Sequence, residues 1–316
     1  MRAKFVAVLV VVTAVVLSCA APSAVAASKL YWTDEGSIKR ANLDGSEVET
    51  VISTGEDFAY LTASRAEKKL YYAIGSPTPQ LWSADLDGGN RELLATLDTA
   101  NYVRGMAFEQ DSRKLYWTSF HGYQAGNGKV RSANADGSDV RDVLTLSDGY
   151  PYGMAIDHAA NVMFWANTDQ NTLERAKLDG TGRQVIGTGV SLTTQLAVDP
   201  AANKLYWIDV EDVKIHWSNY DGSESAVIAS TGSRFTYAYD SGIAVDHASG
   251  SLFWSDTSTD QIYRSDLDGS NATVIISGGL HNPGSMVVVN NPEPSCGLVL
   301  LTLLGARAMT ARRRGR

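Results

Sequence analysis

The chain has 316 residues, a formal net charge of −8 and only two cysteines, Cys19 and Cys296. The negative charge is concentrated in residues 28–291, which contain 20 Lys and Arg against 34 Asp and Glu. An acidic surface of this kind repels phosphate backbones, so we do not expect nucleic-acid binding. Because both cysteines lie in terminal segments, we expect the part between them to be held by packing and not by a disulfide.

The first segment has the features of a secretory signal peptide. Two basic residues precede the apolar run 5–17, and the small residues Ala24-Val25-Ala26 follow as a cleavage site. This order is typical of a bacterial export signal that is cut after Ala26 or the next residue. The alternatives are an uncleaved anchor helix and a lipoprotein acylated at Cys19. In each case we expect residues 1–27 to lie outside the folded domain.

The central part of the chain consists of six similar units. Each unit has an aromatic pair within a short apolar run, at Tyr31-Trp32, Tyr71-Tyr72, Tyr116-Trp117, Phe164-Trp165, Tyr206-Trp207 and Phe253-Trp254. An Asp-Gly turn follows each pair, and successive turns are 42 to 49 residues apart, at Asp44, Asp87, Asp136, Asp179, Asp221 and Asp268. Buried aromatic rings remove a large apolar area from water, which explains why they recur at one position.

The fifth unit shows the expected secondary structure most clearly. It contains four short apolar runs separated by loops or tight turns, at residues 196–199, 204–209, 213–218 and 226–228. Asp221-Gly222 indicates a hairpin, because glycine adopts positive φ without steric strain. Four strands in a repeat of about 40–45 residues are typical of a propeller blade. We therefore predict an all-β, six-bladed β-propeller over residues 28–291, with four antiparallel strands in each blade.

These units resemble the Tyr-Trp-Thr-Asp repeat, also called the low-density-lipoprotein-receptor class B repeat. The match is nearly complete in the first unit, where Lys29-Leu30-Tyr31-Trp32-Thr33-Asp34 is followed by a second run and its Asp-Gly turn. The resemblance covers roughly residues 28–290 and implies a six-bladed, TolB-like propeller. Ile74, Ser119 and Asn167 replace the Asp of the motif in units two to four, so we expect those blades to lack the hydrogen bonds that the family makes there.

The first unit opens on its second strand. No run like Gly242-Ile243-Ala244-Val245-Asp246 precedes Lys29, but such a run appears after the sixth unit, at residues 284–290. We therefore predict that residues 284–290 pair beside residues 29–34 in the first blade. A ring closed in this way leaves no free strand edge at its seam.

The last segment, residues 292–316, differs from the repeats in composition. Pro292-Glu293-Pro294 precedes the apolar run 296–306, and a cluster of arginines ends the chain. This order resembles the PEP-CTERM sorting signal of exopolysaccharide-producing Gram-negative bacteria. The resemblance implies transient contact of a short helix with the inner membrane, with its arginines on the cytoplasmic side, and cleavage near the motif by an exosortase-like enzyme. The alternative is a disordered basic tail.

Loops that enter the innermost strands ring one mouth of a propeller channel, and in this chain they are rich in aromatic residues. We predict that the ligand-binding residues of this channel face are Phe58, Tyr60, Tyr102, Arg104, Tyr150, Tyr152, Tyr237, Tyr239, Asp240, His281 and Asn282. The family resemblance implies a protein partner on such a face, and aromatic rings also stack on sugars, so we expect a protein or carbohydrate ligand. The alternative is that half of the tyrosines pack between blades.

The sequence contains no recognised catalytic or metal-binding motif. Its five histidines form no His-x-x-x-His pair, and no Gly-x-Ser-x-Gly elbow is present. His158 and His247 follow equivalent aspartates in loops, which favours a structural role for both. We therefore expect no catalytic residue, no bound metal and no cofactor.

These observations favour an exported, non-enzymatic binding or scaffold protein of the bacterial cell surface or its exopolysaccharide matrix. One rival is a metal-dependent hydrolase similar to the gluconolactonase-like propellers, with a metal near Asp57, Asn101, Asp240 and Asn282. Another is a structural surface-layer component without a specific ligand. The fold by itself does not decide between these functions.

Overall fold

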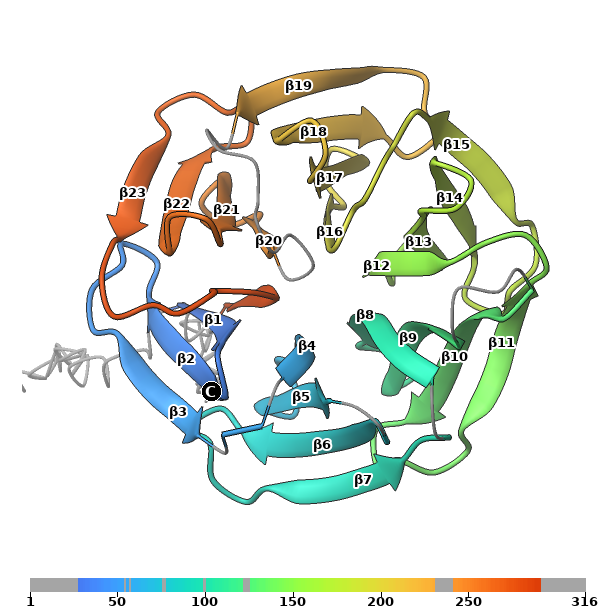
Figure 1. The fold of residues 1–316 in the computed structure, drawn as a ribbon, viewed down its shortest axis with the longest axis horizontal. Coiled ribbons are helices and arrows are strands. Elements are labelled where there is room, and N and C mark those ends of the chain that lie inside the picture. The colour runs from blue at the N-terminus through green and yellow to red at the C-terminus, as the bar shows by residue number, and fades with distance from the viewer. Residues whose placement is uncertain are drawn as a thin grey trace, which may run out of the picture. The chain divides into compact units, whose positions relative to one another are not determined.

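The computed structural model describes residues 28–53, 55–56, 58–75, 78–98, 101–121, 126–230 and 241–290. In this part of the chain, β-strands form six four-stranded antiparallel sheets around a common centre (Figure 1). The prediction of a six-bladed propeller is therefore confirmed. None of the described residues belongs to a helix that is long and apolar enough to cross a membrane.

Within each blade the strands follow one another from the centre of the wheel to its rim (Figure 1). Blade 1 contains β24 (Met286–Val289), β1 (Lys29–Asp34), β2 (Ser37–Asn42) and β3 (Glu49–Ser53). Blade 2 contains β4 (Phe58–Ser64), β5 (Lys69–Ile74), β6 (Gln80–Asp85) and β7 (Glu92–Thr96). Blade 3 contains β8 (Asn101–Glu109), β9 (Lys114–His121), β10 (Gly128–Asn134) and β11 (Arg141–Leu146).

The second half of the wheel repeats this order. Blade 4 contains β12 (Pro151–Asp157), β13 (Val162–Asn167), β14 (Thr172–Lys177) and β15 (Gln184–Thr188). Blade 5 contains β16 (Leu196–Asp199), β17 (Lys204–Asp209), β18 (Lys214–Asn219) and β19 (Ser225–Ser230). Blade 6 contains β20 (Ile243–Asp246), β21 (Ser251–Asp256), β22 (Gln261–Asp266) and β23 (Thr273–Ile276).

The first and last strands of the propeller share blade 1. Strand β24 pairs antiparallel with β1, with Lys29 opposite Val289 and Trp32 opposite Met286. The pairing continues beyond the strand, because the backbone nitrogen of Thr33 donates to the carbonyl oxygen of Ser285 at 3.0 Å. The predicted closure of the ring is confirmed, and it gives blade 1 four strands, the number found in each of the other blades.

The aromatic pairs form the core between neighbouring blades. Successive residues of a strand point to opposite faces of its sheet. Tyr31 accordingly packs toward blade 2, in one cluster with Tyr72, whereas Trp32 packs toward blade 6, in one cluster with Phe253. Blade 5 divides its aromatic pair between its two neighbours in the same way. Each pair therefore joins a blade to the blade before it and the blade after it.

The glycine of each Asp-Gly turn packs against the outer strand of the preceding blade. Gly222 has a φ of 74°, and a Cβ at this position would overlap the carbonyl oxygen of Ile186 in β15. Equivalent carbonyl oxygens lie against the five other turn glycines, Gly45, Gly88, Gly137, Gly180 and Gly269. Glycine is therefore needed both for the backbone conformation of the turn and for the close approach of the neighbouring blade.

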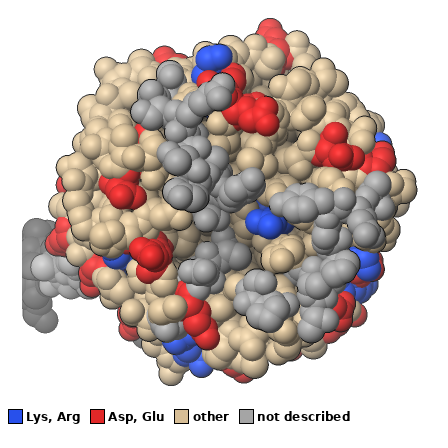
Figure 2. Space-filling model, viewed as in Figure 1, with Lys and Arg blue, Asp and Glu red and all other residues tan. Residues whose placement is uncertain are grey.

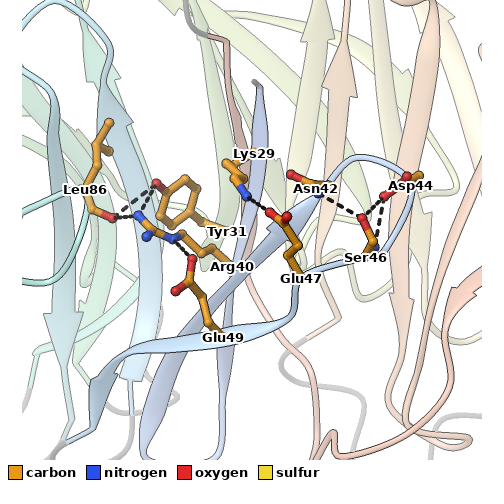
Figure 3. A network of polar contacts seen from close by, with 9 residues as sticks. All are labelled: Lys29, Tyr31, Arg40, Asn42, Asp44, Ser46, Glu47, Glu49 and Leu86. Atoms are coloured by element: carbon orange, nitrogen blue, oxygen red, sulfur yellow. Dashed lines mark hydrogen bonds and ion pairs between the residues drawn. The ribbon is translucent and has the colours of Figure 1, made fainter. Parts of the chain in front are cut away.

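Polar contacts in blade 1 stabilise its turn and tie it to blade 2 (Figure 3). The Asp44 carboxylate accepts hydrogen bonds from the backbone nitrogen of Ser46 at 2.9 Å and from its hydroxyl at 2.6 Å. The Arg40 guanidinium donates to the carbonyl oxygen of Leu86 at 2.8 Å, and the Tyr31 hydroxyl donates to the same oxygen at 3.1 Å. Leu86 directly precedes the Asp-Gly turn of blade 2, so this turn is fixed by the blade before it.

The Asp of the sequence motif ties down the loop that leads into its own blade. In blade 1, the Asp34 carboxylate accepts a hydrogen bond from the backbone nitrogen of His281 at 2.7 Å. In blade 5, the Asp209 carboxylate accepts one from the backbone nitrogen of Ser191 at 3.0 Å. In these two blades the motif Asp therefore links the second strand to the segment that enters the innermost strand, whereas the described hydrogen bonds of Asp256 in blade 6 go to its own turn.

The expectation that blades 2 to 4 lack such bonds is wrong for blade 4. The Asn167 amide donates to the carbonyl oxygen of Asp148 at 3.4 Å and to the Glu174 carboxylate at 2.8 Å. The link to the loop is retained with reversed polarity, because an amide donates where a carboxylate accepts. In blade 3, the buried Ser119 hydroxyl has no hydrogen-bond partner among the described residues, and the hydrocarbon side chain of Ile74 in blade 2 can form none.

Candidate binding face

The predicted aromatic residues of blades 3 and 4 lie where β8 and β12 begin, and these two strands are the innermost of their blades (Figure 1). Tyr102 and Arg104 belong to β8, Tyr152 belongs to β12, and Tyr150 directly precedes β12. We predicted loop positions for these residues, but the antiparallel ladder of β8 and β9 already begins at Asn101. Most of the group is therefore held by sheet hydrogen bonds and not by a loop.

A β-bulge places Arg104. In the β8–β9 ladder, Val103 is opposite Ser119 and Gly105 is opposite Thr118, which leaves Arg104 without a register partner. A bulge redirects the side chain of the extra residue and increases the local twist of the strand. The starts of β4 and β12 show comparable irregularities. Three consecutive blades thus depart from regular pairing on this side of the centre.

Aromatic rings surround the Arg104 guanidinium. Its central carbon lies 5.0 Å from the ring centroid of Tyr102, and 5.3 Å from those of Phe120 and Tyr152. The Phe120 ring also packs against Tyr150 and Tyr152, at centroid distances of 5.2 and 5.4 Å. A cation within about 6 Å of an aromatic centroid is attracted to the π face of the ring. These five residues, which we name the Arg104 cluster, therefore hold one another in place.

The Arg104 cluster has a buried base and an accessible edge. Phe120 and Tyr152 are 1% and 3% exposed, whereas Tyr102 is 40% exposed and the side chains of Arg104 and Tyr150 are partly exposed. Figure 2 shows Lys or Arg atoms near the middle of the face in view, with acidic atoms nearer its edge. The Tyr102 ring is thus the most exposed part of the cluster, and it lies on a packed base.

A side-chain amide links the inner strands of blades 5, 6 and 1. The oxygen of Gln195, directly before β16, accepts hydrogen bonds from the backbone nitrogens of Ile243 at 3.2 Å and Met286 at 3.0 Å. Its nitrogen donates to the Met286 carbonyl oxygen at 2.8 Å. One residue thus joins three consecutive blades near the centre. The sequence alone did not single out Gln195, because nothing in its local pattern indicates which strands it reaches.

Other predicted site residues lie apart from this cluster. Tyr60 is 4% exposed and packs in the core between blades 2 and 3, as the alternative for half of the tyrosines proposed. His281 and Asn282 have exposed side chains in the loop before β24. Their backbone nitrogens donate to the carboxylates of Asp34 at 2.7 Å and Asp260 at 2.8 Å. The described contacts thus place Tyr60 in the core and fix the backbone at His281 and Asn282, and a binding role for these two exposed side chains stays a prediction.

Several predicted residues lie outside the described part of the structure. They are the side chain of Phe58 and the residues Tyr237, Tyr239, Asp240, Pro292, Glu293 and Pro294. The same holds for the side chains of Asp57 and Asn101, on which the hydrolase prediction partly depends. The member of the cluster that the sequence analysis missed is Phe120. Its signal in the sequence was its position two residues after Thr118 in the motif strand. The structure places it opposite Tyr102 in the β8–β9 ladder.

One group of potential metal ligands comes together among the described residues, at Asp209, Asp212 and His216. These residues belong to the β17–β18 hairpin and not to an inner strand. The Asp209 carboxylate already accepts hydrogen bonds from two backbone nitrogens at 3.0 Å each, and Asp212 forms an ion pair with Lys214 at 3.1 Å. This arrangement stabilises a hairpin, and it leaves few carboxylate lone pairs for a cation.

Comparison with known proteins finds similar sequences, although no family profile matches the chain. It is 26% identical over 160 residues to a human low-density lipoprotein receptor-related protein 5-like protein, covering 50% of this chain and 61% of the relative. It is 33% identical over 166 residues to low-density lipoprotein receptor-related protein 1 of Pyricularia oryzae, covering 44% and 53%. A match to mouse nidogen-2 is 32% identical over 84 residues, covering 27% and 6%. The chain thus spans less than two thirds of each of these relatives.

Solved structures share the fold. A chain of the crystal structure of a nidogen/laminin complex superposes with a TM-score of 0.74 at 18% identity, covering 84% of this chain and 99% of that one. TolB from Acinetobacter baumannii gives a TM-score of 0.62 at 10% identity, covering 83% and 66%. At these identities the likeness shows the fold alone. Together with the sequence relatives, it supports a six-bladed propeller built from repeats like the class B repeat.

Proposed function

We propose that this propeller, with repeats like those of the low-density lipoprotein receptor-related proteins, is a non-enzymatic binding module. Its ligand, a protein or a carbohydrate, is held on the channel face at the Arg104 cluster. The observation that carries the proposal is the position of Tyr102, which is 40% exposed beside a guanidinium and a base of buried rings. Accessible aromatic side chains on a rigid base are what binding sites for proteins and sugars have in common.

The relatives support a binding role. Receptor-related proteins and a nidogen are among the sequence matches, and the similar solved chain comes from a complex of nidogen with laminin. A protein partner is therefore the first ligand class to test. The hydrolase alternative receives no comparable support from these relatives or from the described residues.

We also propose that the protein is exported to the cell surface or matrix of a Gram-negative-type bacterium. The basis is the signal-peptide pattern in residues 1–27 and the sorting pattern in residues 292–316. Mass spectrometry of the mature protein from its native host tests this directly. The mature chain should begin at residue 27 or 28 and end near the Pro292-Glu293-Pro294 motif. Recovery of an intact residue 1–316 chain from the cytoplasm would show that export is wrong.

The binding function is tested with the full chain and a matched pair of variants. Wild type, Tyr102→Ala and Val185→Ala are compared against glycan arrays, the host's exopolysaccharide and its secreted proteins. Val185 is 57% exposed in the rim strand β15, so it controls for loss of exposed apolar surface away from the centre. Tyr102→Ala should weaken binding roughly tenfold or more, since central aromatic residues dominate interfaces. The proposal fails if no ligand is found, or if the two variants bind every ligand equally well.

A further inference from the structure

We infer that the group recognised by Arg104 is a carboxylate, carried by an acidic side chain of a peptide or protein partner. This inference rests on the proposed function of the channel face and adds the chemical class of the ligand. It starts from the guanidinium, which is the only charged group within the Arg104 cluster.

Arg104 has no anionic partner among the described residues. Within the described part of the chain, none of its nitrogens has a hydrogen-bond or ion-pair partner, and its Nε is also buried. Arg40 pairs with Glu49 at 2.5 Å and Arg183 with Glu174 at 2.6 Å, whereas Arg175 and Arg264 donate to the neutral oxygens of Gln184 and Ser251 at 3.0 Å each. Arg104 differs from both groups, because it is partly buried and has no oxygen partner among the described residues.

The aromatic rings hold Arg104 but do not satisfy its donors. A guanidinium has five N–H groups in a planar fork, whereas a π face attracts the charge without offering an oxygen acceptor. The described rings therefore reduce the contact of Arg104 with water and leave its hydrogen-bonding capacity free. A carboxylate suits these N–H donors, because its two oxygens can accept two parallel hydrogen bonds from one edge of the guanidinium.

The charge of the domain favours a peptide over an acidic polysaccharide. Residues 28–291 have 14 more acidic than basic residues, so the propeller as a whole repels anions. A polysaccharide with a carboxylate on each sugar would bring many negative charges close to this negatively charged domain, although only one of them could pair with Arg104. The repulsion of the others would weaken binding. A peptide segment brings a single carboxylate, and its apolar neighbours can contact the exposed Tyr102 ring.

The test begins with random peptides displayed on phage and selected on the immobilised full chain. Selected peptides are then synthesised, and their affinities are measured by fluorescence anisotropy. They should share an Asp or Glu, and its replacement by Asn or Gln should weaken binding roughly 10- to 100-fold, as expected for a lost hydrogen bond to a charged group. Arg104→Gln should weaken binding to the same extent. Combining both changes should add little, because each removes the same contact.

Arg91→Gln is the matched control. Arg91 also lies over an aromatic ring, at 5.2 Å from the Trp82 centroid, but it directly precedes the rim strand β7. Its replacement should leave peptide affinity unchanged. If Arg104→Gln does not fold, Arg104→Lys replaces it, since lysine keeps the charge without the planar fork and should bind acidic peptides less tightly than wild type. The change from acid to amide in the peptide tests the inference on wild-type protein in any case.

The other outcomes separate this inference from the proposed function. If peptides bind in a Tyr102-dependent way but are indifferent to Arg104 and to acidic residues, the carboxylate inference is wrong and the binding function stands. If oligogalacturonate binds through Arg104 and no peptide does, the assignment to a protein partner is wrong. If neither peptides nor oligogalacturonate bind, the inference is wrong, and the proposed function is decided by the glycans and secreted proteins of the first experiment.

Discussion

Met286 lies directly opposite Trp32 in the ladder of β24 and β1, and both side chains belong to one core cluster. One of these strands is the last of the propeller and the other is the first. The seam of the wheel is thus an ordinary antiparallel pair with a shared core. Blades 1 and 6 consequently depend on residues from the far end of the chain.

Replacing Met286 with Asp should therefore destabilise the whole propeller. Met286 is 1% exposed, and an unpaired charge buried at such a site costs about 3–5 kcal/mol. Deleting residues 284–290 should abolish cooperative unfolding. Val274→Asp in the rim strand β23 is the control, since Val274 is 43% exposed and its change should stay within about 0.5–1 kcal/mol. Urea unfolding followed by circular dichroism compares them, and equal midpoints for the two Asp variants would contradict the closure.

Gly222→Ala should lower the free energy of unfolding by more than the strain of a positive φ alone explains. Gly222 and Gly182 both have positive φ, 74° and 69°, but only Gly222 faces a carbonyl oxygen of the neighbouring blade. Gly182→Ala should therefore lose about 1–2 kcal/mol from the conformation alone. Gly222→Ala should lose about 3 kcal/mol or more, because the turn must also move away from Ile186. Similar losses in unfolding free energy would show that the contact between the blades is unimportant.

Replacing Asn167 in blade 4 with the Asp of the motif should lower the stability of the propeller. The Asn167 amide donates to the Glu174 carboxylate at 2.8 Å, and Glu174 is 1% exposed. Asn167→Asp would place a second carboxylate there, at a cost of about 2–4 kcal/mol unless one of the two is protonated. The double variant with Glu174→Gln should recover much of the loss, since a neutral amide can donate to the new carboxylate. Thermal melting of both variants distinguishes this account from one in which the motif Asp is favourable in every blade.

The buried tyrosines should make the propeller unstable in alkali. Burial raises the pKa of Tyr206 to about 12, and it also raises the pKa of Tyr31, Tyr71, Tyr72, Tyr116 and Tyr220. Tyrosine in an unfolded chain titrates near pH ~10. The folded state therefore holds these protons more tightly, so their contribution to stability is complete below pH ~10 and is lost at higher pH, for Tyr206 as the pH rises through about 12. Urea midpoints between pH 8 and 12 measure this loss, which should be smaller in Tyr206→Phe. A midpoint that stays constant over this range would contradict the assigned burial.

The sequence was sufficient for the blade count, the strand order and the closure. The blade count and the strand order follow from signals that recur in each unit, the aromatic pair and the Asp-Gly turn. The closure follows from a strand that is missing before Lys29 and present at residues 284–290. The candidate site was predicted only in part. Tyr102, Tyr150 and Tyr152 were found as residues entering inner strands, but the exposure of Tyr102 and the burial of Tyr60 could not be told apart, because both have the same local pattern.

Only the tertiary structure decided which residues meet across blades. The rings around Arg104 come from β8, β9 and β12, and a bulge that has no sequence signature directs the guanidinium among them. Gly222 lies against the carbonyl oxygen of Ile186 because the turn of blade 5 packs against the outer strand of blade 4. Strand patterns and turn chemistry are properties of neighbouring residues and repeat with each unit. Contacts between blades depend on twist, register and the side chains of another unit, so they exist only once the ring has closed.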